Sequence, residues 1–125
     1  MGQRVAPQHN DPRDVQVETV FAALADPVRL AIVRQLAESE DWSRACGSFD
    51  VPVGKAGLSH HFTVLREAGL VEQRDAGARR VNRLRRKEVD ARFPGLWGLV
   101  LPLTADQASG SSSSSSSSLP PLASR

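Results

Sequence analysis

The chain has 125 residues, 40% of them hydrophobic, and 16 Lys or Arg against 14 Asp or Glu give a formal net charge of +2. This length allows one domain at most, and without a run of 18 or more apolar residues we expect no membrane-spanning helix. The N-terminal stretch lacks the apolar segment of a secretory signal, and a single cysteine, Cys46, suits a reducing cytosol. We therefore expect a cytoplasmic protein without membrane contacts.

The composition along the chain predicts three parts. Residues 1–13 contain two prolines and little periodicity, and we expect a flexible arm there. Residues 104–125 include eight consecutive serines before a Pro pair, which predicts a disordered tail because such a segment buries too little apolar surface to offset its ordering entropy. The folded unit is then residues 14–103, near the lower end of domain size.

Two helices are predicted first. Apolar side chains at i, i+3, i+4 and i+7 indicate a first helix with one apolar stripe: Val17, Val20, Phe21 and Leu24. A second helix begins at Asp26-Pro27, where Asp26 can cap the free amide groups and Pro27 fits the first helical position. Its main stripe is Val28, Ile32 and Leu36.

Three further helical segments and a hairpin follow. We predict a short third helix of about two turns within residues 41–49, and then a break at Pro52 and Gly54. The next helix runs from Lys55 to Ala68 and ends at Gly69, which can adopt the left-handed conformation. Residues 71–74 and 79–84 predict a β-hairpin, and a last helical stretch over 87–101 should be kinked or divided in two at its Pro-Gly pair. This order predicts a mainly α fold with a small hairpin, a winged helix-turn-helix.

The segment "KAGLSHHFTVLREAGLV", residues 55–71, contains two adjacent histidines that could be ligands, catalysts or parts of opposite helix faces. Helical periodicity places His61 on one face with three apolar residues, Leu58, Phe62 and Leu65, so we expect His61 at the core edge, hydrogen-bonded within the protein. The opposite face has small or polar side chains: Lys55, Ala56, Ser59, His60, Thr63 and, one turn on, Arg66. Such a face can approach a DNA major groove closely, and we assign these residues to DNA binding, with Lys55, Ser59 and His60 nearest to the bases.

The charge distribution also favours a nucleic-acid partner. Residues 1–54 hold five arginines and eight acids (5 − 8 = −3), whereas residues 55–92 hold ten Lys or Arg and five acids (10 − 5 = +5). Arg79 and Arg80 follow the hairpin turn, and we predict that they contact DNA, with the basic residues of 83–87 contributing general attraction. The alternative is an ordinary solvated, charged face.

Two stretches, "ALADPVRLAIVRQLAE" and "GLSHHFTVLREAGLVEQRDAGARRVNRL", resemble the ArsR/SmtB family of small bacterial repressors, over about residues 17–101. The resemblance implies a homodimer joined through its first and last helices, with two recognition helices on a palindromic operator. It also implies, in many members, release from DNA by an effector, which the sequence does not identify here. At the implied interface we expect five apolar residues: Val17, Phe21, Leu96, Trp97 and Val100.

The sequence departs from the family at the start of the recognition helix and at the positions of the metal ligands. Family members often have Ser or Thr where this chain has Gly54, Ala56 and Gly57, and metal-sensing members have a Cys pair on the third helix or His and acidic ligands on the last. Here Cys46 stands alone and no histidine follows His61, so we predict no metal site and no cofactor.

No catalytic arrangement is recognisable, and we predict that the protein is not an enzyme. Two alternatives to a DNA-binding regulator stay open. One is a winged-helix module for protein–protein interaction, and the other is a redox-responsive regulator that uses Cys46 beside Arg44.

Overall fold

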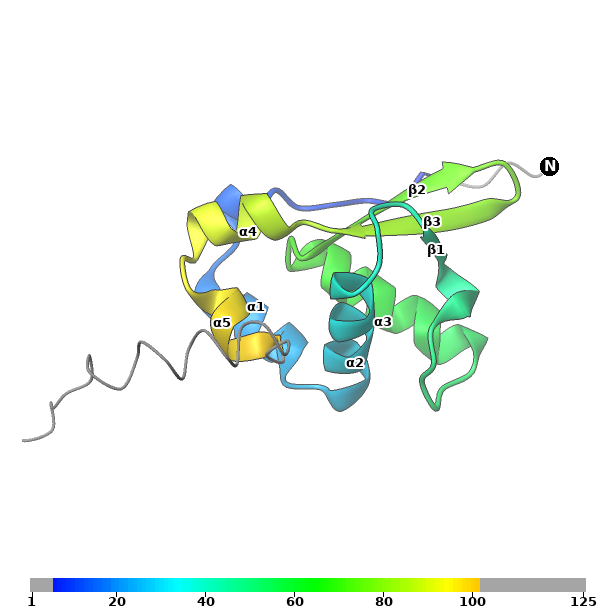
Figure 1. Ribbon diagram of the computed structural model, residues 1–125, viewed down its shortest axis with the longest axis horizontal. Helices are drawn as coiled ribbons and strands as arrows, with labels where there is room; N and C mark the ends of the chain where they lie inside the picture. The colour runs from blue at the N-terminus through cyan, green and yellow to red at the C-terminus, as the bar shows by residue number, and fades with distance from the viewer. Residues whose placement is uncertain (1–5, 102–125) are drawn as a thin grey trace, which may run out of the picture.

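The computed structural model describes residues 6–101, and most of its helices lie on one side of a small sheet (Figure 1). In chain order the elements are η1 (Pro12–Asp14), α1 (Val17–Leu24), α2 (Pro27–Ala37), β1 (Arg44–Ala45), η2 (Cys46–Ser48), α3 (Lys55–Glu67), β2 (Val71–Ala76), β3 (Arg79–Leu84), α4 (Arg86–Arg92) and α5 (Leu96–Val100). The mainly helical architecture with a β2–β3 wing after α3 is that of a winged helix-turn-helix, as predicted.

The helix boundaries follow the local sequence signals. Asp26 accepts hydrogen bonds from the amides of Val28 (2.8 Å) and Arg29 (3.2 Å), so α2 begins where predicted. After α3 the chain turns at Gly69, whose φ is +76°. Pro94 and Gly95, the latter with φ +90°, separate α4 from α5, which confirms the predicted division of the last helical stretch.

The sheet has three antiparallel strands in the order β1-β3-β2. The wing pairs Val71 with Leu84 at its base and Ala76 with Arg79 at its tip. Gly77 in the turn has φ +65°. The hairpin prediction is confirmed, with β2 two residues longer than expected.

The prediction of a third helix within residues 41–49 is wrong. Trp42 has φ +66°, which is incompatible with a right-handed helix. Its backbone amide donates a hydrogen bond to the carbonyl of Asn82 (2.9 Å). Arg44 and Ala45 then form β1 on the edge of β3, and only one 3-10 turn follows. The backbone groups of this segment form hydrogen bonds with β3, about forty residues away in sequence, instead of within a local helix.

Helices α1 to α5 and the base of the wing share one core. Its central members include Ile32 and Val33 of α2, Leu65 of α3, Leu70 just before β2 and Val71 at the start of β2, all at 0% exposure. Other core members come from α4 and α5: Val89, Leu96, Trp97 and Val100. No helix in the described residues is long and apolar enough to cross a membrane.

The described part of the predicted flexible arm, residues 6–13, is packed against the domain. The Nε2 atom of His9 accepts a hydrogen bond from the Gln73 amide (2.9 Å), and the Gln8 carbonyl accepts one from Arg66 (2.9 Å). Pro12 is buried, with its backbone against Gly69. The segment therefore lies along α3 and β2 and is not free. Residues 1–5 and the predicted tail over 104–125 lie outside the described residues.

Candidate nucleic-acid interface

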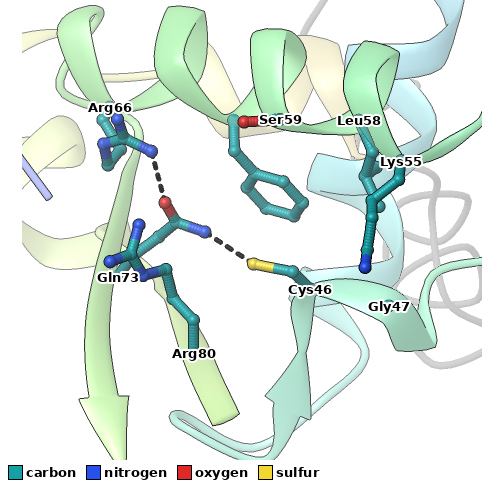
Figure 2. A pocket seen from close by; sticks show the side chains of 9 residues that line it. Cys46, Gly47, Lys55, Leu58, Ser59, Arg66, Gln73 and Arg80 are labelled. Atoms are coloured by element: carbon teal, nitrogen blue, oxygen red, sulfur yellow. Dashed lines mark hydrogen bonds between the residues drawn. The ribbon is translucent and has the colours of Figure 1, made fainter. Parts of the chain in front are cut away.

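The two faces of α3 have opposite environments. Phe62 and Leu65 are buried at 2% and 0% exposure, and Leu58 packs against the same core. The opposite face contains four exposed residues, Lys55, Ala56, Ser59 and His60, and the half-buried Thr63. Figure 2 shows Lys55 and Ser59 on α3 above the sheet. Helix α3 therefore presents small and polar side chains outward over its first two turns.

The two histidines have different surroundings. The Nδ1 atom of His61 lies 3.1 Å from the guanidinium of Arg29, which also donates to the Ala23 carbonyl (2.8 Å). Because arginine can only donate, Nδ1 of His61 is the acceptor in this contact. The prediction that His61 is hydrogen-bonded at the core edge is confirmed, while His60 faces outward. Across the described residues, no three His, Cys, Asp or Glu side chains are grouped so that they could hold a metal ion.

Arg66 differs from the other residues assigned to DNA. Its guanidinium donates to the Gln73 side chain, the Gln8 carbonyl and the Thr63 hydroxyl. Thr63 in turn donates to the Ser59 carbonyl (3.1 Å). Burial and, second, the charge of Arg80 lower the pKa of Arg66. Arg66 thus anchors the N-terminal segment to α3, and neither Arg66 nor Thr63 presents its polar atoms freely to a partner.

The two wing arginines are also distinct. Arg79 is exposed at the tip of the wing, whereas Arg80 is half-buried and pairs with Asp75 at 2.9 Å, its cross-strand neighbour. Sequence reasoning missed this pair, although Asp75 and Arg80 flank the hairpin turn symmetrically, a position where opposite charges pair across strands. Of the two, Arg79 is the cation more available to a polyanion.

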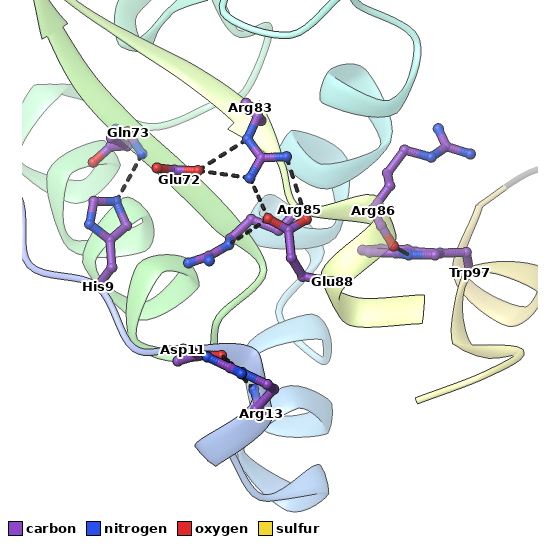
Figure 3. A network of polar contacts seen from close by, with 10 residues as sticks. All are labelled: His9, Asp11, Arg13, Glu72, Gln73, Arg83, Arg85, Arg86, Glu88 and Trp97. Carbon is purple, nitrogen blue, oxygen red and sulfur yellow. Dashed lines mark hydrogen bonds and ion pairs between the residues drawn. The ribbon is translucent and has the colours of Figure 1, made fainter. Parts of the chain in front are cut away.

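Much of the basic run after the wing is neutralised within the protein. Arg83 donates to Glu72 (2.8 Å) and to Glu88, and Arg85 lies 3.6 Å from Glu88 (Figure 3). Burial raises the pKa of Glu88, but hydrogen bonds from Arg83 and the neighbouring positive charges hold it below its ordinary value. The general attraction predicted for residues 83–87 therefore falls mainly to the exposed Arg86 and Lys87.

The residues predicted for a dimer interface divide into two groups. Val17 and Phe21 on α1 are 40% and 54% exposed, which leaves their surface available to a partner. In contrast, the three α5 residues are only 6–9% exposed, because α5 folds into the core of its own chain: Leu96, Trp97 and Val100. Trp97 also donates to the Arg86 carbonyl (3.0 Å). On α5 the exposed apolar residue is Leu99, at 81%, which sequence reasoning did not single out.

Cys46 is half-buried and hydrogen-bonded. Its sulfur accepts from the side-chain Nε2 of Gln73 at 2.9 Å, and the same Nε2 donates to Oδ1 of Asn82 at 2.8 Å. Burial raises the pKa of the Cys46 thiol above its ordinary value, which lowers the fraction of reactive thiolate at neutral pH. These surroundings do not favour the redox alternative.

Comparison with known proteins agrees with this geometry. Residues 24–74, which span the end of α1 to the middle of β2, match the family model of a helix-turn-helix domain.

Among curated proteins, the HTH-type transcriptional regulator Rv2034 of Mycobacterium tuberculosis is 42% identical over 69 residues. This match covers 54% of the present chain and 62% of that protein, so the chain spans about three fifths of its relative.

Among solved structures, the transcriptional repressor BigR from Xylella fastidiosa is similar with a TM-score of 0.52 and 28% identity. That similarity covers 70% of the present chain and 88% of BigR.

Proposed function

We propose that this protein is a DNA-binding transcriptional regulator whose helix α3 lies in the major groove. The observation that carries the proposal is the exposure pattern of α3: Phe62 and Leu65 on its apolar face are buried, and its outward face is small or polar and without acidic residues through residue 63. Small side chains allow close approach to base edges, and Ser59 and His60 offer hydrogen-bonding atoms to them.

The cations around this face support a duplex as the partner. Lys55 at the start of α3 and Arg79 at the tip of the wing are exposed, and neither forms an ion pair within residues 6–101. Cations of this kind displace counterions from phosphates, which supplies much of the affinity of DNA-binding proteins. Arg80 adds a charge that Asp75 partly offsets.

We further propose that the protein acts as a homodimeric repressor on a palindromic operator. The exposed apolar residues of α1 and α5 would pair across a two-fold axis: Val17, Phe21 and Leu99. Two copies of α3 would then enter successive major grooves, about 34 Å apart. The two similar proteins are a transcriptional regulator and a transcriptional repressor, which supports this role. Membership of the ArsR/SmtB family and a cytoplasmic location stay predictions from sequence.

The test is selection of bound DNA from a random pool by the full chain, followed by titration of the selected duplex at several salt concentrations. We expect a palindromic consensus and an affinity that falls steeply as salt rises, because each phosphate contact releases counterions. A pool that yields no consensus, together with binding that does not respond to salt, would refute the proposal and favour a protein-interaction module.

A further inference from the structure

A pocket of about 390 Å³ lies between α3 and the sheet, next to the proposed DNA surface. Figure 2 shows the side chain of Lys55 running from α3 toward Cys46 and Gly47, with Gln73 and Arg80 on the strands opposite. This volume is within the range of about 300–1,000 Å³ that is typical of small-molecule sites. It is large enough for one or two fused aromatic rings or a short alkyl chain.

The lining of the pocket is apolar with cations at its edges. Leu58 and Phe62 supply hydrocarbon surface, and three cationic residues complete the wall: Lys55, Arg66 and Arg80. No acidic side chain lines it, and Asp75, which pairs with Arg80, offsets part of the positive charge. The pocket therefore combines an apolar interior with an excess of positive charge.

The polar atoms around the pocket suit an anion rather than a cation. The hydrogen-bond partners of Arg66 are all neutral, and burial together with the charge of Arg80 lowers the pKa of Arg66. A bound carboxylate would relieve that repulsion. The Cys46 thiol, whose pKa is raised by burial, stays neutral and so does not repel an anion.

We propose that this pocket binds a small organic acid, with its apolar body against Leu58 and Phe62 and its carboxylate between Lys55 and Arg80. The proposed binding site is argued from the pocket alone, whereas the competition with DNA described next rests on the proposed function. Lys55 and Arg80 cannot serve a ligand carboxylate and a DNA phosphate at once, so the acid and DNA compete. By linkage, DNA must weaken binding of the acid by the same factor as the acid weakens binding of DNA.

Calorimetric titration of the full chain without DNA tests the site, with benzoate, 1-naphthoate and octanoate as probes. We expect at least one of these acids to bind saturably at one site per chain. The neutral 1-naphthamide and inorganic phosphate should bind at least about tenfold more weakly, since one lacks the charge and the other the apolar body.

The adjacent arginines offer a matched control. Arg80→Gln and Lys55→Gln should each weaken binding of the acid about tenfold, whereas Arg79→Gln, which removes an equal charge outside the pocket, should leave it unchanged. The proposal is overturned if no acid binds saturably, if naphthamide or phosphate binds as tightly as the acid, or if Arg79→Gln costs as much as Arg80→Gln.

The competition is measured separately, by the affinity for the selected duplex with and without the bound acid. A lower DNA affinity in the presence of the acid supports the proposal. An unchanged DNA affinity would overturn the claim that the acid and DNA compete. Failure to bind any DNA would refute the proposed function while leaving the calorimetric result intact.

Discussion

Gly69→Ala is a sharp test of how the N-terminal segment is held. Gly69 has φ +76°, and a Cβ atom there would lie 3.0 Å from the Cα of Pro12 and 3.2 Å from its nitrogen. The left-handed backbone costs an alanine about 1–2 kcal/mol, and forcing a methyl group against packed backbone costs about 1–3 kcal/mol more. We therefore expect the free energy of unfolding to fall by about 3 kcal/mol.

Two other glycines separate these contributions. Gly77 has φ +65° with open space around it, so Gly77→Ala should show the backbone cost alone, about 1–2 kcal/mol. Gly47 lacks a positive φ and is also open, so Gly47→Ala should be neutral or stabilising by about 0.4–1 kcal/mol.

The assay is urea unfolding of the three variants and the unmodified chain at one protein concentration, followed by tryptophan fluorescence, since Trp97 is buried in the native core. The expected order of stability is Gly47→Ala, then Gly77→Ala, then Gly69→Ala. If Gly69→Ala costs no more than Gly77→Ala, the N-terminal segment is not packed against this turn, and the reasoning fails.

Four further predictions follow from individual contacts. Asp26→Ala removes the side-chain cap of α2 and should cost about 1 kcal/mol in urea unfolding; no loss would show that the cap is dispensable. Burial and, second, Arg66 lower the pKa of His9 from 6.5, so the unfolded chain binds a proton more readily than the folded one. The contribution of His9 to stability is then complete above pH 6.5 and declines as the pH falls below it, a slope that His9→Gln should reduce in unfolding measurements between pH 5 and 7. Phe21→Glu should shift the proposed dimer toward monomer in sedimentation, whereas Thr19→Glu on the same helix should not; equal behaviour would place the interface elsewhere. Arg66→Gln should lower stability but largely keep operator preference, and the reverse result would make Arg66 a base-reading residue.

The parts of the fold that were predictable depend on local signals. The cap at Asp26, the turn at Gly69 and the break at Pro94 and Gly95 each follow from the chemistry of one or two neighbouring residues. The conformation of the segment around Trp42 was not predictable in this way, because it depends on backbone pairing with β3. A short stretch with weak helical preference yields to a distant strand that offers unpaired backbone groups.

The candidate site shows the same division. Helical periodicity alone separated Lys55 and His60 on the outside from Phe62 and Leu65 in the core. It could not show that Arg66 is engaged, because one of its acceptors, the Gln8 carbonyl, lies 58 residues away. Likewise, the sequence pattern of an apolar α5 residue does not distinguish packing in the core of its own chain from packing against a partner.

The most direct test of the central claim compares unmodified protein, Lys55→Ala and His60→Ala on the selected duplex and on a scrambled one. If α3 reads the major groove, each substitution should reduce operator preference by about 1–3 kcal/mol for a good base contact. Operator preference that is unchanged in both variants, with the proteins still folded, would contradict the assignment of this helix face to DNA.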